Sequence, residues 1–137
     1  MKSITRCRAL AAACAILFAA SAAAVKYQAP ASEVAQLPQF CWAQYMEGVE
    51  GPEYSIPAKE CGVGMNHYCP GLISLIEAKH AVGSKARDRP GRLNSARKDV
   101  LYTLNAMTNY PNCPIREHAE ATLKEVEMLQ KMTPQRH

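Results

Sequence analysis

The sequence lacks the short motifs that mark most catalytic and cofactor-binding proteins. No two cysteines stand three positions apart, so neither the thiol-exchange pair Cys-x-x-Cys nor the haem-attachment motif Cys-x-x-Cys-His is present. There is no Gly-x-Ser-x-Gly and no glycine loop that could cradle a phosphate. No nucleophile, base and orienting group can be assembled from these residues. We therefore predict that the protein is not an enzyme and binds no cofactor.

The chain also has little net charge outside its first 24 residues. The formal net charge of +4 comes from 16 basic and 12 acidic residues. Three basic residues, Lys2, Arg6 and Arg8, and no acidic ones precede position 25. Residues 25–137 therefore carry a net charge of about +1. This balance gives no basis for an electrostatic nucleic-acid surface, so we expect no nucleic-acid partner.

Residues 1–24 have the organisation of a cleavable secretory signal peptide. The basic residues are followed by a run from Ala9 to Ala24 that contains no charge and ends in three alanines. This run is shorter than the ~20 apolar residues of a membrane-spanning helix. We predict cleavage after Ala24, no stable membrane span after cleavage, and a periplasmic or secreted protein.

Four cysteines follow the signal segment, at Cys41, Cys61, Cys69 and Cys113. An even number of cysteines in an oxidising compartment favours two disulfides, and four cysteines allow three pairings. A bond between Cys61 and Cys69 would close a short glycine-containing loop. It would leave Cys41 and Cys113 to join the first helix to the last. We prefer this pairing, although the sequence leaves the other two open.

Apolar periodicity and helix breakers predict a small, disulfide-stabilised, all-α domain over residues 37–132. No stretch alternates as a strand would. The helices are expected at 38–47, 70–82, 92–108 and 114–132. The remaining segments are a flexible N-terminal arm over 25–36, loops rich in glycine, proline and charge over 48–65 and 83–92, and a C-terminal tail over 133–137.

Three segments suggest similarity to a known family. They are residues 67–72 (HYCPGL), a helix around residues 99–104 (DVLYTL), and a second Cys-Pro helix start at residues 113–117 (CPIRE). Together they resemble small exported bacterial proteins of tetratricopeptide-repeat type, in which an H-Y-C-x-G-L run opens a repeat. The resemblance covers residues 66–129, roughly half the chain. It implies a repeat-like helix hairpin with flanking helices, with Gly71 and Ala96 as the small residues where paired helices approach. It also implies an adaptor that binds a protein or peptide and is not catalytic.

Candidate partner-binding residues are tyrosines and arginines. A tyrosine offers apolar area with a polar tip, which suits a binding groove, although core packing explains each tyrosine equally well. The arginines lie in the basic loop, which could meet an acidic partner or the acidic segment 47–60 of another copy, so self-association stays open. The residues concerned are Tyr68, Tyr102, Tyr110, Arg87 and Arg89.

An alternative interpretation is a periplasmic metal-binding protein that uses the segment from Cys61 to Cys69. Sulfur and imidazole ligands in an exported protein suit copper or zinc. The ligands would be Met65, His67, Cys69 and His118. We favour disulfides over metal ligation because of the even cysteine count and the compartment, and we predict no metal.

Intact mass spectrometry of the protein isolated from its exported compartment tests this reading. We expect a mass that starts at Val25 and lacks the hydrogens of two disulfides. Reduced thiols together with a retained metal would contradict the disulfide interpretation and favour the metal-binding alternative.

Overall fold

The computed structural model describes residues 27–133, and the described chain is all-α, with no strand between these residues. The predicted signal peptide and residues 134–137 of the predicted tail lie outside the described residues. The α-helices are α1 (Ala31–Val34), α2 (Ala58–Cys61), α3 (Tyr68–His80), α4 (Arg89–Ala106) and α5 (Arg116–Met132). The 3₁₀-helices are η1 (Gln39–Gln44), η2 (Pro52–Tyr54), η3 (Val63–His67), η4 (Gly83–Asp88) and η5 (Met107–Asn109). The predicted fold class is confirmed.

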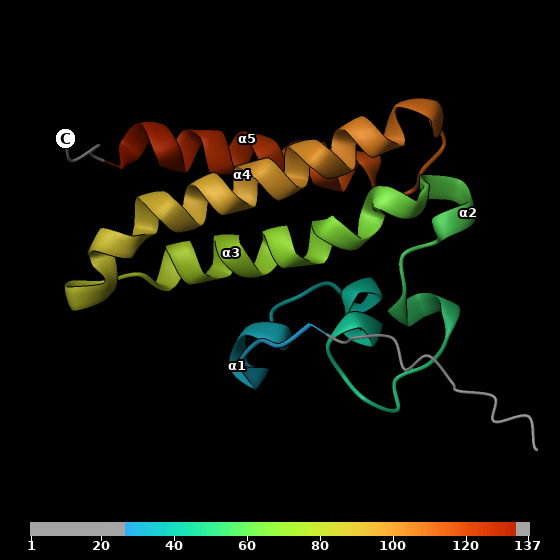
Figure 1. The fold of residues 1–137 in the computed structure, drawn as a ribbon, viewed down its shortest axis with the longest axis horizontal. Helices are drawn as coiled ribbons and strands as arrows, with labels where there is room; N and C mark the ends of the chain where they lie inside the picture. The colour runs from blue at the N-terminus through green and yellow to red at the C-terminus, as the bar shows by residue number, and fades with distance from the viewer. Residues whose placement is uncertain (1–26, 134–137) are drawn as a thin grey trace, which may run out of the picture.

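The three long helices form one unit, here called the three-helix bundle (residues 68–133). Helix α4 packs against both α3 and α5, and the three lie side by side along the long axis of the molecule (Figure 1). The buried residues Leu93, Ala96 and Val100 recur every three or four positions on α4, which is the spacing of one helix face. The expected periodicity of this helix therefore matches the face that packs in the bundle.

Helix α3 lies close against α4 at Gly71. A Cβ atom at Gly71 would lie 3.1 Å from Cβ of Asp99 and 3.5 Å from the carbonyl oxygen of Ala96. Even an alanine at position 71 would crowd the side chains of Asp99 and Val100, which would have to shift by a few tenths of an ångström. The expectation that Gly71 and Ala96 mark the close approach is thus consistent with the structure.

Helices α3 and α4 begin slightly earlier than the sequence predicts, because each tolerates a proline in its first turn. Helix α3 begins two residues before Pro70, and α4 begins one residue before Pro90. Backbone N–H groups in the first turn have no partner within the helix, so a proline there costs no hydrogen bond. Position 70 was expected to open the helix, whereas it lies inside the first turn.

Residues 27–67, here called the N-terminal lobe, contain only short helices: α1 lies beside α3, whereas α2 lies at one end of the long helices and η3 packs mainly on α4 (Figure 1). The predicted flexible arm over 25–36 differs from the structure in its described part. The Tyr27 amide donates a hydrogen bond to the carbonyl oxygen of Gln44 at 3.0 Å, and Val34 is buried. A helix of four residues presents too few apolar positions to produce a periodic pattern, which is why the sequence suggested no structure here.

The two disulfides join different cysteines from the predicted pairs. Cys41 is bonded to Cys69, with Cα atoms 5.7 Å apart, and Cys61 is bonded to Cys113, with Cα atoms 4.7 Å apart. The preferred pairing of Cys41 with Cys113 and Cys61 with Cys69 is therefore wrong. Both bonds connect the N-terminal lobe to the three-helix bundle.

The local packing explains this pairing. Cys41 lies in η1, where the neighbouring Phe40 stacks on Tyr68 in the first turn of α3, next to Cys69. Cys61 ends α2, and the next residue, Gly62, lies under the ring of Tyr110 in the connection between α4 and α5. This contact places Cys61 near Cys113 rather than near its neighbour in sequence.

Between residues 27 and 133, no helix is long and apolar enough to span a membrane.

Removal of each disulfide should lower the free energy of unfolding by a different amount. The bonds close segments of 52 and 28 residues, and loop-closure entropy gives about 4 kcal/mol for Cys61–Cys113 and about 3.5 kcal/mol for Cys41–Cys69. Urea unfolding of the Cys61→Ser/Cys113→Ser and Cys41→Ser/Cys69→Ser variants measures both losses. Mapping of non-reduced peptides provides the control, and a peptide joining Cys61 to Cys69 would contradict the structure.

Candidate functional site

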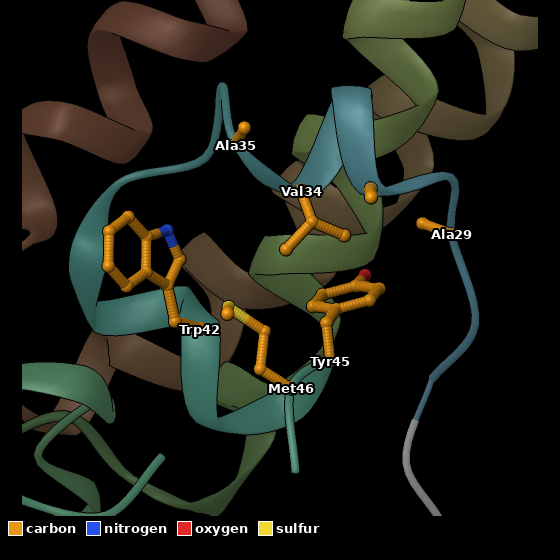
Figure 2. A pocket seen from close by; sticks show the side chains of 7 residues that line it. Ala29, Val34, Ala35, Trp42, Tyr45 and Met46 are labelled. Carbon is orange, nitrogen blue, oxygen red and sulfur yellow. The ribbon is translucent and has the colours of Figure 1, made fainter. Parts of the chain in front are cut away.

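An apolar pocket of about 300 Å³ lies between α1 and η1 in the N-terminal lobe (Figure 2). This volume is at the lower end of the range for ligand-binding pockets. Its walls are mostly small aliphatic or aromatic side chains. The lining residues are Ala29, Ala31, Val34, Ala35, Trp42, Tyr45 and Met46.

The pocket is hollow because the side formed by α1 and its flanking residues is built mainly from alanine. Pro30 has an extended backbone (φ −56°, ψ 139°) and turns the chain into α1. The amide of Val34 closes the turn by donating to the carbonyl oxygen of Pro30 at 3.0 Å. Each alanine contributes one methyl group, so the side chains of α1 cannot fill the space opposite Trp42. The hollow therefore follows from the composition of this short segment.

The aromatic wall of the pocket is held from two directions. The Nε1 of Trp42 donates a hydrogen bond to the carbonyl oxygen of Leu37 at 3.2 Å. On η2, Tyr54 stacks on the indole with ring centroids 6.0 Å apart and an interplanar angle of 14°. A wall that is fixed before binding loses little conformational entropy when a ligand arrives. The pocket is thus preorganised on its Trp42 side.

Tyr45 forms another wall and stays uncharged. Its ring lies 5.9 Å from the ring of Tyr27. Burial, helped by the nearby Tyr27, raises the pKa of the Tyr45 hydroxyl well above its ordinary value. The phenol therefore remains protonated at any physiological pH, and this side of the pocket remains neutral.

The segment that carries the pocket is strongly acidic. Residues 27–58 contain four glutamates and no lysine, arginine or histidine. The ion pairs found within the described chain all lie between residues 67 and 127, so none involves these glutamates. A cluster of charges of one sign produces a potential that attracts the opposite charge. The glutamates are Glu33, Glu47, Glu50 and Glu53.

Tyr68, a predicted partner-binding residue, lies instead in the core. It has no exposed surface, and its hydroxyl is hydrogen-bonded to Nδ1 of His118 and, at 2.9 Å, to the hydroxyl of Thr122. The ring of Phe40 stacks on it at 6.2 Å. Its position on the face of α3 that looks toward α5 buries it, so it cannot contact a partner directly.

The other two predicted tyrosines point to different places. Tyr110 packs over Gly62. Tyr102 is 52% exposed, and its ring lies 4.3 Å from the ring of His67. The Nδ1 of His67 lies in turn 3.3 Å from Oδ1 of Asp99. The three tyrosines therefore differ in accessibility: Tyr68 is buried, Tyr110 is half-buried and Tyr102 is exposed.

The two predicted arginines flank the boundary between η4 and α4. Arg87 is exposed in η4 and lines an open depression with Gly91, Arg92 and Ser95. Arg89 is half-buried at the start of α4. Of the pair, Arg87 alone presents its side chain freely at the surface.

The ligand set of the metal-binding alternative is not assembled. Cys69 is bonded to Cys41 and offers no thiolate. His67 faces Asp99, whereas His118 faces Tyr68. Over the part of the chain that the structure describes, no group of three or more His, Cys, Asp or Glu side chains could hold a metal ion.

Sequence reasoning missed the pocket itself. Its lining residues fall in the segment expected to be a flexible arm and in the short predicted helix over 38–47. The available signals were the only tryptophan of the chain, Trp42, and the alanines between Pro30 and Pro38. Neither signal indicates a cavity without knowledge of how α1 and η1 face each other.

No protein-family model, curated protein or solved structure matches the chain. The geometry of the described residues is therefore the basis for any functional proposal.

The buried hydroxyl of Tyr68 should make stability depend on pH in the alkaline range. Burial raises the pKa of Tyr68 from 10.0 to about 12. Between these values the unfolded chain releases the proton and the folded chain keeps it, so stability is fully present below about pH 10 and falls as pH rises. Urea unfolding between about pH 8 and about pH 11 should show a weaker pH dependence for Tyr68→Phe than for the unmodified protein. The exposed Tyr102→Phe variant is the control, and equal slopes for Tyr68→Phe and the unmodified protein would contradict this expectation.

Proposed function

We propose that the protein is an exported helical adaptor that binds a protein or peptide partner by accepting an apolar side chain in the pocket between α1 and η1. The observation that carries the proposal is the preformed apolar pocket whose Trp42 wall is fixed by Leu37 and Tyr54. Buried apolar anchors in preformed pockets supply much of the energy of protein recognition. The two disulfides are compatible with an oxidising, exported location.

The chemistry of the lining favours a side chain of a partner over a polar metabolite. The polar side-chain groups of the lining are the indole N–H of Trp42 and the hydroxyl of Tyr45. The indole N–H is already bonded to Leu37, and no charged group lines the pocket. A polar ligand would lose its hydration and find few hydrogen-bond partners in the pocket, whereas an apolar side chain gains from burial.

The arrangement of the bundle supports the tetratricopeptide-like part of the proposal. Helices α3 and α4 form a hairpin, α5 packs on α4, and Gly71 of α3 lies close against α4. This is the helix order of one repeat and the first helix of the next. Two disulfides supply the stability that further repeats would otherwise provide.

Selection of short peptides from a random library against the oxidised protein tests the proposal. We expect selected peptides to share one large apolar residue and to change the fluorescence of Trp42, which is the only tryptophan in the chain. Ala35→Phe fills the pocket and should weaken binding by about 10-fold or more.

The matched control is Ala121→Phe, because Ala121 is exposed on α5 and lies outside the pocket. It should leave the affinity unchanged. Equal affinity of the selected peptides for both variants, or no selection at all, would overturn the proposed function.

A further inference from the structure

A single surface segment combines an exposed apolar side chain with free positive charge. Val82 is 71% exposed between α3 and η4. Lys85 and Arg87 follow within five positions on η4, and neither belongs to an ion pair of the described chain. This segment therefore offers a small apolar side chain together with positive charge that has no ion-pair partner between residues 27 and 133, and such charge can meet an acidic surface.

The N-terminal lobe has the complementary chemistry. Its pocket is lined by apolar side chains, and the surrounding residues 27–58 carry four glutamates and no cation. Val82 would supply the apolar contact, and the cations of η4 would meet the glutamates. Because Val82 is exposed, it does not occupy the pocket of its own chain.

The pocket and the basic segment lie near one another on the molecule. Glu33 of α1 and Lys85 of η4 line one cavity of about 190 Å³, together with Arg92. When Val82 and the pocket lie close together on one molecule, a two-fold axis can place the Val82 of each copy in the pocket of the other within a single interface. A closed dimer then gains two copies of the same contact.

We propose that the protein forms a two-fold dimer in which Val82 of each copy enters the pocket between α1 and η1 of the other. Lys85 and Arg87 lie against the glutamates of the partner's lobe. The inference rests on the proposed function in one respect, since it requires that the pocket accept an apolar side chain. It adds a mode of regulation, because a dimer occupies the pocket and an external partner must displace the second copy.

Sedimentation velocity of the oxidised protein lacking residues 1–24 tests the proposal over a range of concentrations. We expect a concentration-dependent dimer at about 50 mM NaCl that weakens by about 10-fold or more at about 500 mM, because salt screens the exposed charges. Val82→Ser should raise the dimer dissociation constant by about 10-fold or more. Val63→Ser is the matched control, since Val63 is 90% exposed but lies on η3, and it should leave the dimer unchanged.

Two further variants test the role of the positive charges on η4 and of the pocket between α1 and η1. Lys85→Glu/Arg87→Glu should weaken the dimer and Lys124→Glu/Lys131→Glu, on the exposed side of α5, should not. Ala35→Phe should also weaken it by filling the pocket. A protein that is monomeric at all concentrations, or a dimer insensitive to Val82→Ser or Ala35→Phe, would overturn the inference.

Peptide-binding measurements distinguish failure of the dimer proposal from failure of the proposed function. The selected peptides should bind the Val82→Ser monomer at least as tightly as the unmodified protein, because the competing second copy is absent. Peptide binding by a protein that never dimerises would leave the proposed function standing and the dimer refuted. If the dimer depends on Val82 and Ala35 but the protein binds no peptide, the dimer proposal would stand and the proposed binding of an external partner would be refuted.

Discussion

The covalent link between the N-terminal lobe and the three-helix bundle is the constraint on which the functional surface depends. The longest helix of the lobe has six residues, which is too short to be stable by itself in water. The bonds Cys41–Cys69 and Cys61–Cys113 attach this lobe to the bundle at two points. Cys41 lies directly before Trp42, so the first bond also fixes the wall of the apolar pocket.

This arrangement separates two tasks within a small chain. The bundle supplies regular packing, with Gly71 at the crossing of α3 and α4 and internal ion pairs on its surface. The lobe supplies an irregular surface with a cavity and unpaired negative charge. Irregular segments that are held by a rigid scaffold commonly carry binding functions, and both functional proposals place the contact in the lobe.

Much of the bundle could be predicted from its residues, whereas the pocket could not. The periodic stripe of α4 and the proline at 70 are local signals, and they located the long helices to within a few residues, whereas Pro90 was assigned to the loop before α4 and lies in its first turn. The disulfide pairing failed because it was judged from distance along the chain, while Cys61 meets Cys113 through the packing of Gly62 against Tyr110. Tyr68 failed as a surface candidate because only the position of α5 shows that it is buried.

The sequence by itself determined the all-α class, the presence of two disulfides and the acidic character of residues 27–58, because composition, periodicity and charge are properties of the chain alone. The tertiary structure decided which cysteines pair, which tyrosines are buried and where the cavity lies. Each of these depends on two segments that are distant in sequence and meet in space, such as α1 with η1 or α2 with the connection before α5. No local pattern encodes the relative placement of such segments, since that placement results from packing of the whole domain.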